Sequence, residues 1–213
     1  MNAKTPHTRA APAETQVPAP ASGMAGGQGG VLGIGCDRNT PYATLAQAID
    51  EALARLRASW GDVRAVASID LKADEVAMQE LQRQRGHIIH FYPAAWLAQV
   101  PVPNPSETVR KYTGTPSVSE AAALLVAGEV AQALTHAATD DAPAAAGVPQ
   151  HRTPPGASVP VSPRSVSLPE PAPMSALLIE KHKLRGPDGR NATVSVARAG
   201  GMPQTLPETG HPA

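Results

Sequence analysis

Val31-Leu32-Gly33-Ile34-Gly35 is a short apolar run that ends at a polar loop, and this pattern predicts a buried β-strand. Thr40 and Pro41 follow, and they predict a helix with Thr40 as its N-cap and Pro41 in the first helical position. We expect this helix to end at Gly61. Its apolar stripe recurs every three or four residues: Leu45, Ala48, Ile49, Ala52, Leu53 and Leu56.

The alternation of strand and helix continues outward from this first unit. Residues 63–69 predict a second strand, which is apolar except at Arg64 and Ser68 and therefore fits an inner parallel position. A helix that ends near Gly86 is expected next, and residues 88–91 predict a third strand. The chain thus repeats the unit from which α/β folds are built.

Three more helix starts follow the third strand. A short helix is predicted from Pro93. Asn104-Pro105-Ser106-Glu107 resembles a capping box with proline in the first helical position, and Ser117 with Glu120 offers a second box. The helix that this second box opens is apolar nearly all round through residues 121–126, so we expect it to be well buried.

A hairpin completes the predicted order of elements. Residues 176–179 predict a fourth strand and residues 186–189 a turn. Residues 193–197 alternate between polar and apolar side chains, which predicts an edge strand that pairs back. The fold class that we predict is a three-layer α/β/α arrangement with a mainly parallel sheet and a C-terminal hairpin.

Prolines define the predicted domain organisation. Residues 1–30 hold 4 of the 23 prolines and residues 130–173 hold 9, in stretches with almost no large apolar side chains. Such stretches cannot bury enough surface to offset the entropy of ordering. We therefore expect one domain made of residues 31–129 and 174–200, an unstructured insertion at 130–173 and unstructured tails at 1–30 and 201–213.

The charge balance and the apolar runs exclude several classes of protein. The formal net charge is zero, whereas general nucleic-acid binders carry a basic excess, so no nucleic-acid partner is expected. No apolar run approaches the roughly 20 residues of a membrane span, and the first residues lack a secretory signal. We expect a cytoplasmic protein without a membrane partner. Cys36 is the single cysteine, so an intrachain disulfide is impossible.

Three predicted strands end in polar segments, and ligands of open α/β sheets bind beyond the carboxyl ends of the strands. The segments are residues 35–40, 70–75 and 180–183. Helix N-termini and lysines at such an edge would form a cationic rim for a ligand with several carboxylates, although ordinary capping and solvated lysines explain the same residues. The candidate binding residues are Gly35, Asn39, Thr40, Lys72, Asn104, Ser106, Thr115, Ser117, Lys181 and Lys183.

Catalytic candidates lie in the same segments. Cys36 adjoins a predicted helix N-terminus, which would lower its pKa, but a nucleophile also needs a base, and His87 and His90 are candidates only by elimination. Asp70 and Asp74, with the neighbouring Glu75, could act as general acid or base. The alternative interpretations are a small, half-buried Cys36 and an N-cap at Asp74.

Cofactor and metal signatures are weak in this sequence. Gly33-x-Gly35 follows a strand, but Arg38 stands where the dinucleotide fingerprint has its third glycine, and the two glycines are explained more simply by a tight turn. The histidines are scattered without metal-ligand spacing, and His182 is flanked by lysines. We predict neither a metal nor a cofactor.

Five motifs occur in a fixed order along the chain. They are residues 33–36, 67–75, 102–107, 114–122 and 180–183. Together they resemble the CobE family and the C-terminal domain of CbiG, the cobalt-precorrin-5A hydrolase of anaerobic cobalamin synthesis. The likeness covers 31–127 and 175–198, and it adds Gly114, which opens the fourth motif, to the binding candidates. After Cys36 the sequence departs from the basic residues and glycine that are usual in the family.

The resemblance implies a role in corrin-ring synthesis, with a precorrin-type tetrapyrrole as ligand. Three hypotheses remain open. The chain binds or chaperones a precorrin of the aerobic pathway, or it is a hydrolase that acts on a precorrin lactone through Asp70, Asp74 or Cys36. The third is an adaptor that docks other cobalamin-pathway enzymes through residues 130–173.

Overall fold

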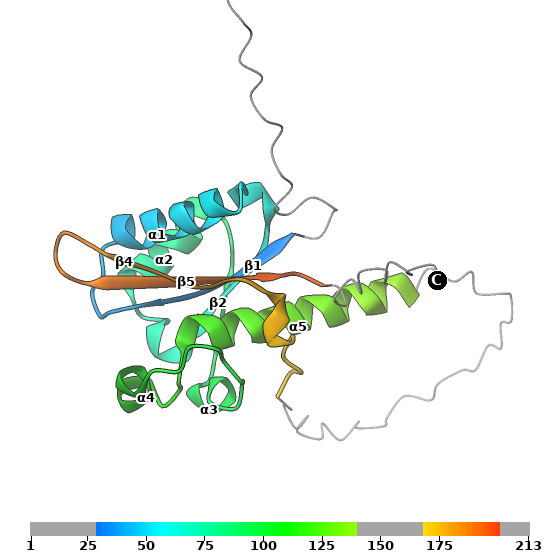
Figure 1. The fold of residues 1–213 in the computed structure, drawn as a ribbon. Helices are drawn as coiled ribbons and strands as arrows, with labels where there is room; N and C mark the ends of the chain where they lie inside the picture. The colour runs from blue at the N-terminus through cyan, green and yellow to red at the C-terminus, as the bar shows by residue number, and fades with distance from the viewer. Residues whose placement is uncertain (1–28, 140–167, 201–213) are drawn as a thin grey trace, which may run out of the picture.

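The strands of the protein form one five-stranded sheet in the order β3-β2-β1-β5-β4. The computed structural model describes residues 29–139 and 168–200, and Figure 1 shows their arrangement. The central strand β1 (Gly30–Cys36) pairs in parallel with β2 (Val63–Ile69), which pairs in parallel with β3 (Ile89–Tyr92). On the other side, β5 (Asn191–Arg198) is antiparallel to both β1 and β4 (Leu177–Arg185).

The observed sheet corrects two details of the prediction. It is mixed rather than mainly parallel, because β5 runs against both of its neighbours. The predicted edge strand at 193–197 lies inside the sheet, and β4 forms the edge instead. The polar residue Ser195 suggested a solvated face, but it is fully buried and its hydroxyl is hydrogen-bonded to the Ser119 hydroxyl at 2.9 Å.

Helices cover both faces of the sheet, which confirms the three predicted layers. Figure 1 shows α1 (Tyr42–Arg55) and α2 (Val76–Arg85) on one face. The other face carries α3 (Ala94–Leu97), α4 (Glu107–Thr113) and α5 (Val118–Thr139). Short 3₁₀ turns connect the rest: Trp60–Asp62, Asp70–Lys72 and Met174–Ala176.

The stripe predicted for α1 forms the centre of one core. Leu45, Ile49 and Leu53 are buried against the sheet, and only Leu56 is half-buried. They pack with Leu32 of β1 on the face that α1 and α2 share. The periodicity of the apolar residues thus predicted both the helix and its buried side.

The helix α5 packs directly on β1 because β1 carries a glycine there. A Cβ atom at Gly33 would lie 1.9 Å from the carbonyl oxygen of Ser119 and 2.5 Å from the amide nitrogen of Ala123. Residues 121–127 are all buried, which confirms the prediction of a buried helix. Over Val118–Ala137 the helix is long and apolar enough to cross a membrane, but 56% of its most apolar window is buried inside this domain.

Helix starts differ from the predictions by one or two residues. Pro41, rather than Thr40, is the N-cap of α1, and Glu75, rather than Asp74, is the N-cap of α2. Ser106, rather than Asn104, caps α4. The end predicted for α1 at Gly61 is also wrong, because α1 ends at Arg55, whereas the predicted end of α2 near Gly86 is confirmed.

The domain boundaries also extend beyond the predicted ones. Helix α5 continues to Thr139, past the boundary expected at 129. Residues before 174 lie on the domain as well, since the amide of Ala172 donates to the carbonyl of Leu124 at 2.9 Å. The remainder of the predicted unstructured segments, residues 1–28, 140–167 and 201–213, lies outside the described residues.

Candidate functional site

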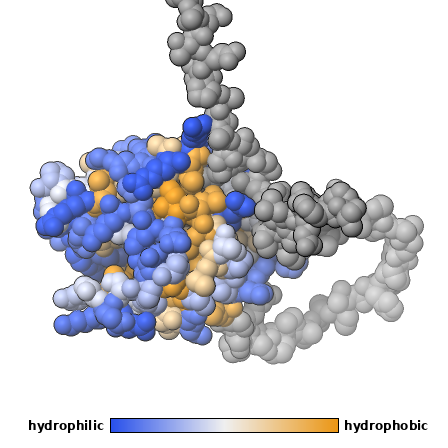
Figure 2. Space-filling model, in the orientation of Figure 1, coloured by the Kyte–Doolittle hydropathy of each residue, from blue (hydrophilic) through white to orange (hydrophobic). Residues whose placement is uncertain are grey.

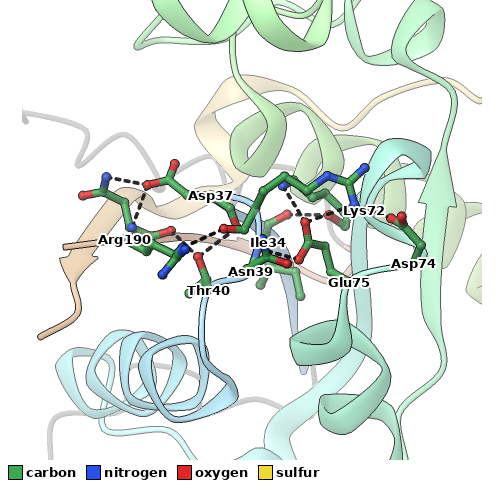
Figure 3. Close-up of polar contacts among 11 residues, drawn as sticks. Ile34, Asp37, Asn39, Thr40, Lys72, Asp74, Glu75 and Arg190 are labelled. Atoms are coloured by element: carbon green, nitrogen blue, oxygen red, sulfur yellow. Dashed lines mark hydrogen bonds and ion pairs between the residues drawn. The ribbon is translucent and has the colours of Figure 1, made fainter. Parts of the chain in front are cut away.

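Two loops meet beyond the carboxyl ends of β1 and β2, and Glu75 joins them. Figure 3 shows its side chain between the loop that follows β1 and Lys72. One carboxylate oxygen accepts the backbone N–H of Asn39 at 2.9 Å. The other oxygen lies 3.2 Å from Lys72 Nζ and 3.2 Å from Arg38 Nη1. Glu75 is only 3% exposed, so three donors hold a carboxylate at the boundary of the core.

Asp74 lies outside this buried arrangement. Its carboxylate forms an ion pair with Arg38 at 2.7 Å, and its side chain is 71% exposed. The hydrogen bond from Arg38 is the main reason why the pKa of Asp74 is lowered. Asp74 is therefore ionised at neutral pH and unsuited to donate a proton. Asp70 is exposed, and no ion pair of its side chain is seen within residues 29–139 and 168–200.

Cys36 faces the side of the sheet that α1 and α2 cover, close to Lys72 and Glu75. Burial raises its pKa to about 11, and the positive charge of Lys72 offsets only part of that effect. The predicted lowering of the Cys36 pKa is therefore wrong, because desolvation outweighs the neighbouring charge. The suggested bases lie elsewhere: His87 packs against Trp60, and His90 lies near Glu129.

Residues at the turn between β4 and β5 are hydrogen-bonded to the loop after β1, on the side away from Glu75. The Asp37 carboxylate accepts the backbone and side-chain N–H groups of Asn191, both at 2.8 Å. The Thr40 hydroxyl donates to the Asp37 carbonyl at 2.8 Å, and Arg190 Nε donates to the Arg38 carbonyl at 2.9 Å (Figure 3). The Thr40 hydroxyl proton is thus already used inside the protein.

A second cluster lies on the opposite face of the sheet, where α5 meets β4. Asn104 Nδ2 donates to Glu120 Oε1 at 2.8 Å and to Glu180 Oε2 at 2.9 Å. Lys181 Nζ donates to the Asn104 carbonyl at 2.8 Å and lies 3.4 Å from Glu120 Oε2. Glu120 is fully buried, and the positive charge of Lys181 offsets its negative charge. Its Oε1 atom accepts the hydrogen bond from Asn104, whereas its Oε2 atom has no hydrogen-bond partner among the described residues.

The other predicted binding residues of this region build the connection between α4 and α5. The Ser106 hydroxyl accepts the amide of Val109, and Gly114 ends α4 with a positive φ of 74°. Thr115 and Ser117 are buried, and the Thr115 hydroxyl has no hydrogen-bond partner among the described residues. Gly35 lies beside the start of α5, since a Cβ there would be 3.5 Å from Val118.

The predicted cationic rim therefore consists of two clusters on opposite faces of the sheet. In both clusters, carboxylates balance the positive charges of the lysines more fully than we expected. Lys72 and Lys181, predicted as free cations, each face a buried carboxylate. Lys183 is exposed, and it has no ion pair within the described ranges. Figure 2 shows that the side of the molecule at the left of Figure 1, where β4 turns into β5, is mostly hydrophilic.

The sequence analysis did not predict that Glu75 connects the loops that follow β1 and β2. It named Glu75 only as a possible acid or base and did not give it a binding role. Nothing in the local sequence distinguishes Glu75 from the exposed Asp74, because its burial depends on Asn39 and Arg38 of another loop. Groups of three or more His, Cys, Asp or Glu that could hold a metal ion are not found in the described part of the chain.

Comparisons with known proteins agree with this architecture. The profile of the family described as "Cobalamin synthesis G C-terminus" matches residues 30–146. Protein CobE of Sinorhizobium sp is 41% identical over 107 residues, 49% of this chain and 70% of that protein. Cobalt-precorrin-5A hydrolase of Priestia megaterium is 38% identical over 97 residues, 46% of this chain but only 26% of the hydrolase.

A solved structure supports the fold independently. The crystal structure of CobE, described as a protein from the cobalamin (vitamin B12) biosynthetic pathway, superimposes with a TM-score of 0.52 at 24% identity. The match covers 86% of this chain and 95% of the other. The resemblance predicted from the five motifs is thereby confirmed.

Proposed function

The chain belongs to the cobalamin synthesis G C-terminus family, and we propose that it acts in cobalamin biosynthesis by binding a corrin-ring precursor. The observation that carries this proposal is the family match over residues 30–146, which includes the loops after β1 and β2 and all of α5. The two curated relatives are a corrin-pathway hydrolase and CobE. The location that we expect is the cytoplasm.

The chemistry of the carboxyl edge suits such a ligand. Corrin precursors carry acetate and propionate side chains, so they present several carboxylates. Arg38 and Lys183 are exposed cations at this edge, and Arg38 lies on the exposed loop that follows β1. Charge-assisted hydrogen bonds to carboxylates are stronger than neutral ones. The ligand would therefore meet the edge through its acidic side chains.

Binding is a better proposal than hydrolysis for this chain. The chain spans only about a quarter of the length of the hydrolase, and the raised pKa of Cys36 argues against a thiolate nucleophile. The second candidate function is still a hydrolase that acts on a precorrin lactone. The observation in its favour is Asp70, which is exposed directly after β2 and within the residues that match the family.

A binding titration separates these candidates. We expect the wild-type protein to quench or shift the fluorescence of uroporphyrin, a tetrapyrrole with a carboxylate on every side chain. Lys183→Ala should weaken binding by about 3-fold to 10-fold and flatten its salt dependence. Arg198→Ala is the matched control, since Arg198 is exposed at the other end of the sheet.

The outcomes are distinct. The absence of binding to uroporphyrin and to a precorrin by the folded protein would refute the proposal. Mass spectrometry of a precorrin incubated with the protein tests the second candidate. A mass change that Asp70→Asn abolishes would establish hydrolysis, whereas an unchanged mass leaves binding as the function.

A further inference from the structure

The donors around Glu75 have the geometry of a site for a carboxylate ligand. A backbone N–H, an ammonium and a guanidinium converge on the two oxygens of one carboxyl group within 2.9–3.2 Å. Ligand carboxylates are commonly held by such a combination of a backbone donor and cations. Here the carboxylate that occupies the donors belongs to the protein itself.

We propose that Glu75 is a built-in competitor whose carboxylate occupies the donors that a ligand carboxylate uses in the complex. This inference rests on the proposed function only in assigning that carboxylate to a corrin-ring side chain. Within the protein, Glu75 balances the charge of Lys72 and shares Arg38 with Asp74. A ligand carboxylate would share or take over the Asn39 N–H, Lys72 and Arg38.

The donors are reachable from the surface. The Arg38 side chain is 57% exposed, and Asn39 lies on the exposed part of the loop. Only the inner side of the cluster is closed, because the Lys72 side chain is 11% exposed and that of Glu75 is 3% exposed. An incoming carboxylate therefore meets Arg38 and the Asn39 N–H first and Lys72 last.

Competition and orientation predict opposite results when the charge of Glu75 is removed. If Glu75 competes, Glu75→Gln leaves the Lys72 ammonium without its buried counter-ion, and anions bind more tightly. If Glu75 only orients Lys72 and Arg38 for the ligand, the same change loosens both cations and weakens binding. Glutamine preserves the size of the side chain and one acceptor oxygen for the Asn39 N–H.

The test is a titration of labelled protein with citrate, followed by the amide resonance of Asn39 in ¹H–¹⁵N spectra. We expect Glu75→Gln to bind citrate about 10-fold more tightly than wild type, with the Asn39 amide among those that shift most. Glu80→Gln is the matched control, because Glu80 lies on the same helix, α2, and pairs with the exposed Arg83. Equal or weaker binding by folded Glu75→Gln would overturn the inference.

A second pair of variants guards against a folding defect. Lys72→Met/Glu75→Gln has no unpaired buried charge, and it should bind citrate more tightly than Lys72→Met, which keeps the competitor. Equal affinities for these two variants would also overturn the inference. Citrate tests the donors without a tetrapyrrole. If citrate behaves as expected and uroporphyrin binds no variant, the proposed function fails while the inference stands.

Discussion

At the scale of residues, the two glycines of β1 occupy very different surroundings. An added Cβ at Gly33 collides with the backbone of α5, at 1.9 Å from the Ser119 carbonyl oxygen and 2.5 Å from the Ala123 nitrogen. At Gly35 it makes an ordinary contact of 3.5 Å with Val118. Backbone atoms of a packed helix cannot move aside separately, so the cost falls on the whole α5–β1 interface.

We therefore expect Gly33→Ala to lower the free energy of unfolding by about 3 kcal/mol or more, and Gly35→Ala to change it by less than about 1 kcal/mol. Urea unfolding followed by circular dichroism measures both values. Similar stabilities for the two variants would contradict the close packing of α5 on β1. Gly35→Ala thus serves as the matched control for Gly33→Ala.

The thiol of Cys36 provides a second test at this scale. Its pKa is raised to about 11 by burial, so the reactive thiolate is scarce at neutral pH. We expect slow alkylation by iodoacetamide at pH 7, with a rate that increases until the pH reaches about 11. A rate that levels off below pH 8.5 would show an activated thiol. Cys36→Ser should bind uroporphyrin as wild type does.

Local residue patterns predicted the carboxyl-edge segments but not their charge balance. The polar turn after β2 was visible in the sequence, whereas the burial of Glu75 follows from contacts with Asn39 and Arg38 on the loop after β1. In the same way, Gly33 was attributed to a tight turn because the approach of α5 involves residues far along the chain. Only tertiary contacts distinguish these roles.

At the scale of elements, one buried ion pair fixes the start of α5 against the edge strand β4. Glu120 is fully buried in the first turn of α5, and Lys181 of β4 lies 3.4 Å from its Oε2 atom. Removal of one partner from a buried pair leaves an uncompensated charge, which costs more than the pair contributes. The Lys181 side chain is 27% exposed, so water screens part of this cost.

We expect Lys181→Met to destabilise the protein by about 1–3 kcal/mol and Glu120→Gln in that background to restore part of the loss. Lys183→Met is the matched control on the same strand and should change stability by less than about 0.5 kcal/mol. Chemical unfolding of the single and double variants gives the coupling energy. Additive effects of the two changes would show that Lys181 and Glu120 do not interact.

The positions of strands and helices along the chain were predicted more reliably than the order in which the strands pair in the sheet. Apolar periodicity located β1, α1 and β2, with β2 at its observed bounds Val63–Ile69. The order of β4 and β5 in the sheet was not predictable in this way, because a hairpin can join the sheet through either strand. The structure pairs β5 with β1, so β4 becomes the edge.

At the scale of the whole molecule, two separate parts of the chain complete one sheet. Strands β4 and β5 come from residues 168–200, and β5 pairs with β1 along its full length from Gly30 to Cys36. The residues that precede β4 are also held on the domain. The amide of Ala172 is hydrogen-bonded to the carbonyl of Leu124, and Leu168 packs on the core beside α5.

Replacement of residues 140–167 by a Gly/Ser linker of equal length tests the adaptor hypothesis. We expect an unchanged melting temperature and continued rescue of a cobalamin auxotroph, because all five strands of the sheet and the helices described on it lie in 29–139 and 168–200. Replacement of 168–173 is the control, and it should lower the melting temperature by about 2–8 °C because the Ala172–Leu124 hydrogen bond and the packing of Leu168 are lost. A 140–167 variant that folds normally but fails to rescue growth would mean that these residues carry a partner contact, and the binding role of the domain alone would then be insufficient.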